Sequence, residues 1–234
     1  MSERPDPTIP AGAALATYAS AWPAAMVFIG PLVLLLLDAD TDDLTIAQSS
    51  AAVAAGWVVF LAALAMVSRS AGTGNFVADY GVRFRPVDLL GLPAGVALQL
   101  AVVPALYWPL GRMWPGTFDT EDVEERATEL VERADGVWLW VLAAVVVIGA
   151  PIVEELVYRG LLQRSVGARI GRWAAWVAVS LLFALIHFSP VEIPGLFVAG
   201  LGFGLGVVLT GRVGPGLITH LAFNATGIAV VLWW

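Results

Sequence analysis

Long apolar segments separated by short polar stretches dominate the chain. A helix needs about 20 mostly apolar residues to cross a bilayer. Segments of that kind predict about seven transmembrane helices, at residues 13–37, 44–67, 87–111, 136–158, 173–189, 193–211 and 213–233. Pro23 and Pro31 predict a kink or a re-entrant stretch in the first segment. The short link at Ser189 and Pro190 predicts that the fifth and sixth segments form an antiparallel hairpin.

The arginines between these segments predict the orientation of the chain. One side of the membrane receives Arg4, Arg69, Arg83, Arg85, Arg159, Arg164, Arg169, Arg172 and Arg212. The other side receives only Arg112, Arg126 and Arg133. Because cytoplasmic loops carry an excess of basic residues, this bias places the N-terminus in the cytoplasm and the C-terminus outside. The outer loops are then acidic, which is typical of a solvated face.

Composition excludes a soluble domain and several kinds of site. Of the 234 residues, 59% are hydrophobic and 13% are charged, whereas globular domains carry about 25% charged residues. The net charge of -7 lies in the loops and no basic patch exists, so nucleic acid is not expected as a partner. The absence of Cys excludes disulfides and thiolate chemistry. All basic residues are Arg, which favours a prokaryotic, multi-pass plasma-membrane protein.

The chain shows no internal repeat and no long linker, so we expect a single membrane domain, 1–234. Within it, 1–135 holds the N-terminal spans and an acidic segment, and 136–234 holds the core that carries the chemistry. Residues 120–134 alternate acidic and apolar side chains, which predicts an amphipathic helix at the outer interface. Small-xxx-small pairs in the sixth segment predict close helix packing, at Gly200, Gly202, Gly204 and Gly206.

Two adjacent carboxylates, Glu154 and Glu155, lie toward the end of the fourth apolar segment. A charged residue at the centre of a membrane helix costs about 2.5 to 3.5 kcal/mol, so such residues tend to face the bundle interior and to be functional. On a helix Glu155 and Arg159 are four residues apart and can pair, whereas Glu154 points about 100° away. One carboxylate is therefore expected to be held by Arg159 while the other stays free.

Both histidines of the chain lie in apolar segments. His187 follows Phe183 by one turn, and His220 precedes Asn224 by one turn, so each pair shares one helix face. A single buried His is more often a hydrogen-bonded core residue than a functional one. The combination with two Glu and one Arg predicts an inward polar cluster, as in a catalytic or ion-conducting site.

Such a cluster has the groups that peptide hydrolysis needs. A carboxylate or imidazole can take a proton from water, and an amide or imidazole N–H can hold an oxyanion. A Glu and two His could also bind zinc, although the H-E-x-x-H helix of many zinc proteases is absent. The alternatives are a proton- or ion-coupled transporter, a non-catalytic membrane scaffold or immunity-type protein, and a purely structural bundle.

Three motifs resemble those of the CPBP family, which is named for CAAX proteases and bacteriocin-processing enzymes and is also called Abi or type II CAAX prenyl endopeptidase-like. Glu154-Glu155-x-x-x-Arg159 is similar to the family's E-E-x-x-x-R motif, Phe183-x-x-x-His187 to its F-x-x-x-H motif, and His220-x-x-x-Asn224 to its H-x-x-x-N motif. The resemblance covers about residues 150–224 and departs from none of the motif positions.

The resemblance implies an intramembrane endopeptidase in an all-α transmembrane bundle. It implies that Glu154 and His187 activate water and that His220 and Asn224 stabilise the oxyanion. The supporting residues would be Glu155, Arg159 and Phe183. Members are widely described as metalloproteases, with Glu154, His187 and His220 as the ligands here if zinc is bound, but we expect a metal-free glutamate mechanism without a cofactor. The expected partners are membrane lipid and a membrane-anchored peptide or protein, prenylated at its C-terminus or not.

Overall fold

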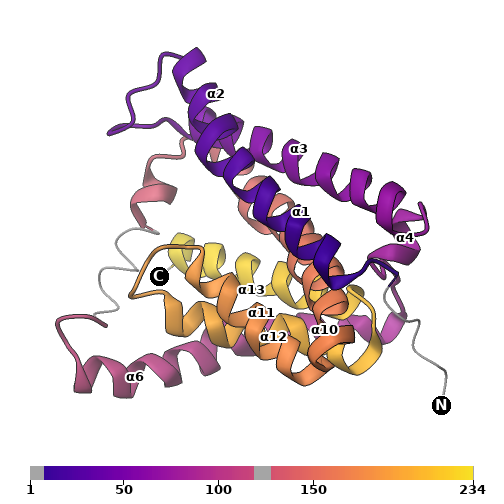
Figure 1. Ribbon diagram of the computed structural model, residues 1–234. Helices are drawn as coiled ribbons and strands as arrows, with labels where there is room; N and C mark the ends of the chain where they lie inside the picture. The colour runs from indigo at the N-terminus through magenta and orange to yellow at the C-terminus, as the bar shows by residue number, and fades with distance from the viewer. Residues whose placement is uncertain (1–7, 119–127, 234) are drawn as a thin grey trace.

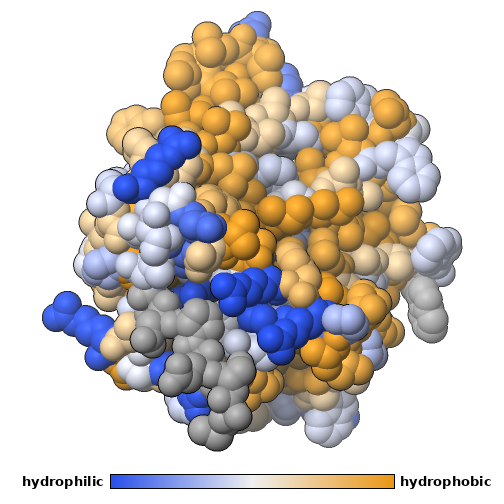
Figure 2. All heavy atoms as spheres, turned by 90° about the vertical axis from the view of Figure 1, so that its right-hand side faces the viewer, coloured by the Kyte–Doolittle hydropathy of each residue, from blue (hydrophilic) through white to orange (hydrophobic). Residues whose placement is uncertain are grey.

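The computed structural model describes residues 8–118 and 128–233, and this part of the chain is helical without a β-strand. Six of its helices are long and apolar enough to cross a membrane: Ala11–Leu36, Ile46–Ala71, Pro86–Met113, Val137–Ile170, Ile193–Thr210 and Gly214–Trp233. Figure 2 shows hydrophobic side chains over most of one face of the molecule. The prediction of an all-α, polytopic membrane bundle is confirmed.

Most of the long helices consist of several segments. The first contains α1 (Ala11–Pro23), η1 (Ala24–Ile29) and α2 (Gly30–Leu36). The second is α3 (Ile46–Ala71), followed by the short α4 (Phe76–Asp79). The third contains η2 (Pro86–Leu90), α5 (Gly91–Ala97), η3 (Leu98–Val102) and α6 (Val103–Met113). The fourth contains α8 (Val137–Ala143), η4 (Ala144–Gly149), α9 (Ala150–Glu154), η5 (Glu155–Gln163) and α10 (Arg164–Ile170). The last three are α11 (Arg172–Leu185), α12 (Ile193–Thr210) and α13 (Gly214–Trp233).

Prolines explain three π-helical segments in these helices. The segments η1, η3 and η4 each end two residues before a proline, at Pro31, Pro104 and Pro151. A proline has no backbone N–H, and its ring pushes away the carbonyl four residues earlier, so the preceding turn widens. The first helix is therefore continuous, with a π-helical stretch between its two prolines. It is not re-entrant.

Two predicted segments differ from the observed helices in a way that matters for the site. The fourth was predicted to end at residue 158, but its helix continues to Ile170 and has 34 residues. The fifth was predicted at 173–189, but α11 has only 14 residues and ends at Leu185. At 1.5 Å per residue α11 is about 21 Å long, shorter than the hydrocarbon core of about 30 Å. The membrane crossing of this segment stays a prediction.

The glycines of α12 allow neighbouring helices to approach closely on two of its faces. A Cβ added at Gly200 would lie 3.3 Å from Phe183 and Ser180 of α11, and one at Gly204 would lie 2.6 Å from Gln163. At Gly202 a Cβ would lie 2.4 Å from Leu98 of η3. The predicted close packing is confirmed, and α11 and α12 form the predicted hairpin.

The N-terminal helices lie against the core that follows them. Figure 1 shows α1 and α3 side by side, on one side of the group formed by α10 to α13. Trp57 of α3 occupies the space beside Gly149, where an added Cβ would lie 2.2 Å from its ring. The Tyr18 hydroxyl of α1 lies 3.3 Å from that of Tyr158 in η5.

Three of the arginines counted for the orientation are buried and have specific partners. Arg159 pairs with Glu155. Arg164 donates to the Asp79 carbonyl at 2.9 Å, and Arg212 pairs with Asp88 through two hydrogen bonds. The positions of these three arginines are explained by their buried partners, so they are weak evidence for the side of the membrane on which they lie. The orientation of the chain stays a prediction.

The predicted amphipathic helix at 120–134 falls partly outside the described residues. Residues 119–127 lie in the gap of the description, and helix is present at 128–132. Its two carboxylates, Glu129 and Glu132, are exposed. Arg133, directly after it, donates to the Leu44 carbonyl at 3.0 Å and pairs with Asp43.

Asp79 connects Thr8, which precedes α1, to residues at and after the end of α3. Its carboxylate accepts hydrogen bonds from Ser68 at 2.6 Å, from the Thr73 hydroxyl at 2.7 Å and from Thr8 at 2.7 Å. Burial by itself raises the pKa of Asp79, but these hydrogen bonds outweigh it and lower the pKa to about 2.

We expect Asp79→Asn to lower the thermal stability of the purified protein, by about 1 to 3 kcal/mol, because an amide cannot accept all of these hydrogen bonds. A carboxyl with a lowered pKa stabilises the fold above pH 4 and loses this contribution as the pH falls toward 2. Unfolding midpoints in detergent at several pH values measure this. An equal loss of stability at pH 2 and pH 7 would contradict it.

Candidate active site

The fourth helix separates its two glutamates into a fixed one and an accessible one. The side chain of Glu155 is 0% exposed and that of Glu154 is 26% exposed. Arg159, also 0% exposed, lies with Nη1 3.4 Å from Glu155 Oε1 and donates through Nη2 to the Gly200 carbonyl at 2.9 Å. The geometry confirms that Arg159 pairs with Glu155 and leaves Glu154 free of it.

His220 of α13 joins the two glutamates. Its Nδ1 lies 3.0 Å from Glu155 Oε1, and its Nε2 lies 3.8 Å from Glu154 Oε2. An ionised carboxylate only accepts, so Nδ1 donates to Glu155. Phe203 of α12 stacks on the imidazole, with ring centroids 4.0 Å apart and an interplanar angle of 13°. His220 is therefore held by a hydrogen bond along its edge and by an aromatic ring on its face.

His187 follows the end of α11 and is oriented by the residue one turn earlier. Its Nδ1 lies 2.7 Å from the Phe183 carbonyl oxygen. A carbonyl oxygen only accepts, so Nδ1 carries the hydrogen and Nε2 of the neutral ring is an acceptor. The Phe183 ring lies between the two imidazoles, with centroid distances of 5.0 Å to His187 and 6.0 Å to His220.

Asn224 is positioned by a carbonyl that a proline leaves without a backbone partner. In η4 each hydrogen bond joins residues five positions apart, as the Ala150 N–H does when it donates to the Val145 carbonyl. The next donor in that register would be Pro151, which has no N–H, so the Val146 carbonyl is left without one. Asn224 Nδ2 donates to this carbonyl at 2.8 Å. Its amide keeps a second N–H for another acceptor.

Counting residues from the turn at Gly171 predicts that Glu154 and His187 lie at a similar level in the hairpin of the fourth helix and α11. Glu154 lies 17 residues before Gly171, where the chain turns, and His187 lies 16 residues after it. Sequence counting placed the two residues at opposite ends of their segments, because it ended the fourth helix too early. Among the described residues no hydrogen bond or ion pair joins Glu154 to His187, whereas Glu154 does contact His220.

Residues 136–226 match the family model of the type II CAAX prenyl endopeptidase Rce1-like proteins. The chain is similar to this family over these residues, which are less than half of its length. The match contains all three motifs and agrees with the resemblance drawn from them. No curated protein and no solved structure matches the chain significantly. The family and the six membrane helices point to a protease in a multi-pass membrane protein.

Sequence reasoning missed several residues of the Rce1-like site. Phe203 stacks on His220, and Tyr158 packs edge-on against Phe183 with centroids 5.4 Å apart. Neither has a signal of its own, because an aromatic residue in an apolar helix is usually part of the core. Gln163 did have one, since it follows Arg159 by four residues in a buried segment. It donates to the Gly204 carbonyl at 2.8 Å.

The site does not present a ligand set for a metal ion. In the described ranges no group of three or more His, Cys, Asp or Glu is arranged to hold one. Glu155 Oε1 is already shared by His220 and Arg159, so it does not fit as a ligand. The alternative ligands Glu154, His187 and His220 are not drawn together around one point. We therefore derive no step through zinc.

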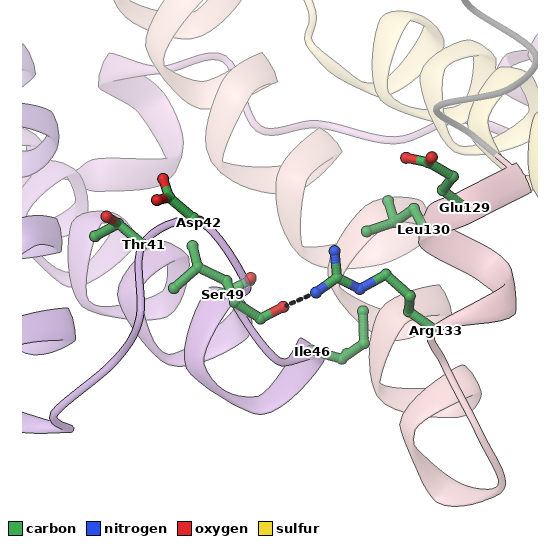
Figure 3. Close-up of a pocket in the computed structure, with 8 residues that line it drawn as sticks. Thr41, Asp42, Ile46, Ser49, Glu129, Leu130 and Arg133 are labelled. Atoms are coloured by element: carbon green, nitrogen blue, oxygen red, sulfur yellow. Dashed lines mark hydrogen bonds between the residues drawn. The ribbon is translucent and has the colours of Figure 1, made fainter.

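A groove of about 360 Å³ elsewhere on the molecule contains none of the motif residues. Figure 3 shows it between the start of α3 and the short helix at 128–132, with Arg133 beside it. Arg133 Nη2 donates to the Leu44 carbonyl across the groove. Asp42 and Glu129 lie at its edge. The groove belongs to the acidic loop region and is separate from the Rce1-like site.

Arg159→Met should destabilise the protein strongly, by about 3 to 5 kcal/mol, because it leaves the buried carboxylate of Glu155 without its cation. Adding Glu155→Gln should restore part of that loss, since the uncompensated charge is then removed. Unfolding midpoints of the single and double variants measure this, with Arg169→Met on the exposed part of the same helix as the control. Additive losses in the double variant would contradict a coupled pair.

Proposed function

We propose that the chain is an intramembrane endopeptidase that hydrolyses a peptide bond of a membrane-associated protein or peptide, through water activated by Glu154 and His187. The observation that supports this proposal most strongly is that two adjacent carboxylates of one helix differ in exposure: Glu154 is partly exposed and Glu155 is fully buried. Glu155 is committed to Arg159 and His220, so it orients the site, while Glu154 remains accessible to take a proton.

The proposed reaction uses side chains of this chain alone. Glu154, with His187 Nε2 as a second acceptor, takes a proton from water as the water oxygen bonds to the scissile carbonyl carbon. The carbonyl oxygen becomes an oxyanion, which accepts from the second N–H of Asn224 and from His220 when its Nε2 is protonated. The C–N bond then breaks as Glu154 gives the proton that it took from water to the leaving nitrogen. The products are a carboxylate and an amine.

The family name suggests the substrate class. The matching family consists of type II CAAX prenyl endopeptidase Rce1-like proteins, so a prenylated peptide ending in a CAAX sequence is the first substrate to test. Exposed apolar side chains beside the site, such as Ile152 and Phe188, are consistent with a lipid-attached substrate that approaches through the bilayer. The comparisons do not favour the transporter, scaffold or immunity-type alternatives.

Glu154→Gln and His187→Ala should each lower cleavage of a farnesylated CAAX peptide by at least about 100-fold, as expected for loss of a general base. The assay uses purified protein in detergent and detects the released tripeptide by mass spectrometry. Glu132→Gln, which removes an exposed carboxylate of the short helix at 128–132, is the matched control and should keep full activity. Unchanged cleavage by Glu154→Gln would contradict the proposal.

A strong chelator should leave the cleavage rate unchanged, because no proposed step uses a metal. The same wild-type preparation is assayed before and after dialysis against the chelator, and again after addition of zinc. Loss of activity that zinc restores would contradict the metal-free mechanism. The assignment of the site residues would then still be tested by the Glu154 and His187 variants.

A further inference from the structure

A glutamine lies inside the bundle on the helix face that packs against α13. Gly91, Gly95 and Gln99 are four residues apart and share that face. At the first two positions the backbones almost touch, since a Cβ added at Gly95 would lie 2.3 Å from the Thr219 carbonyl oxygen. At the third position the glycine is on α13, where a Cβ added at Gly227 would lie 3.5 Å from Gln99 Nε2.

The amide of Gln99 has no partner in the described part of the chain. Its Oε1 is buried and accepts no hydrogen bond there. Polar groups in membrane helices are usually paired, because leaving one unpaired is costly. Gln99 as a whole is half-buried. Rotation about the bond to its terminal amide can turn either the oxygen or the nitrogen toward Gly227. Its polar group can therefore reach a ligand that enters beside α13.

The backbone at Gln99 repeats the feature that positions Asn224. In η3 the Val103 N–H donates to the Leu98 carbonyl, five residues earlier. The next donor in that register would be Pro104, which has no N–H, so the carbonyl of Gln99 is left without one. Gln99 thus offers a side-chain amide and a backbone carbonyl at a π-helical segment, and such segments are frequent at functional sites.

The position of Gln99 relative to the candidate site follows from α13. Gly227 is seven residues after His220, which places the two on the same face of the helix, two turns apart. Seven residues at 1.5 Å each give about 10 Å along the helix. An extended peptide advances about 3.3 Å per residue, so it covers this distance in about three residues.

We propose that Gln99 is a substrate-binding residue that holds the backbone N–H and carbonyl of one extended substrate residue, about three residues from the scissile bond. This inference rests on the proposed function and adds to it a second point of attachment. The Gln99 Nε2 donates to the carbonyl oxygen of that residue and its Oε1 accepts from the N–H of the same residue, because these two groups point to the same side of an extended chain. Because both bonds are made to the backbone, Gln99 fixes the register of the substrate without selecting its side chains.

The test measures binding separately from cleavage. The probe is a fluorescein-labelled farnesylated CAAX peptide, and its affinity is measured by anisotropy for Glu154→Gln and for Glu154→Gln with Gln99→Leu. We expect Gln99→Leu to weaken binding about three- to tenfold, as for loss of one or two hydrogen bonds. Thr226→Val is the control, because the Thr226 hydroxyl already bonds the Ala222 carbonyl of its own helix and the affinity should not change.

A scan in which single peptide bonds of the substrate are replaced by ester bonds identifies the substrate residue that Gln99 binds. Replacing one peptide N–H by an ester oxygen should weaken binding at one position about three residues from the cleaved bond. The same ester should have no effect once Gln99→Leu is present. Equal affinity with and without Gln99→Leu, no measurable binding, or ester effects that Gln99→Leu leaves unchanged would overturn the inference. A wild-type protein that binds the peptide but never cleaves it would refute the proposed function instead.

Discussion

Glu155 is a carboxylate with no exposed surface in the middle of a membrane helix, and Arg159 and His220 are the groups that make its burial tolerable. An isolated charge in an apolar interior is costly, so neither partner can be removed without leaving the other groups uncompensated. This requirement ties α13 to the fourth helix. Arg159 extends the connection to α12 through the Gly200 carbonyl, and the aromatic rings of Phe183 and Phe203 cover it. The accessible Glu154 owes its position to this neighbouring cluster.

Backbone features outside the motifs complete the arrangement. Pro151 leaves the Val146 carbonyl without a backbone donor, and Asn224 binds there, so a residue of the fourth helix orients the amide of α13. The short helix α11 ends at Leu185, and His187 directly after it is oriented by the Phe183 carbonyl. Aromatic contacts of the N-terminal helix close this region from the other side, because Tyr18 contacts Tyr158 and Trp22 packs against Phe188 with centroids 5.8 Å apart. Residues outside the Rce1-like segment therefore help to shape the site.

The helical membrane bundle, the pairing of Glu155 with Arg159 and the close packing at the glycines of α12 were predictable, because each depends on composition or on residues a fixed distance apart. The extension of the fourth helix to Ile170 was not, since Arg164 has the character of a loop charge until its contact with the Asp79 carbonyl is known. The link between Asn224 and Val146 depends on a π-helical register, and the stacking of Phe203 on His220 depends on how distant helices pack. Neither has a local signal in the sequence.

The central claim is that the hairpin at Gly171 places Glu154 and His187 at the same depth. The chain contains no Cys, so a single cysteine at Ile152 or at Leu185, both exposed and two residues from Glu154 and His187 in the sequence, can carry a spin label. Accessibility of each label to oxygen and to a water-soluble relaxation agent in liposomes gives its depth. Ile152 lies 19 residues before Gly171 and Leu185 lies 14 residues after it, so the structure predicts depths that differ by less than about 10 Å. One label near each surface of the bilayer would contradict the account.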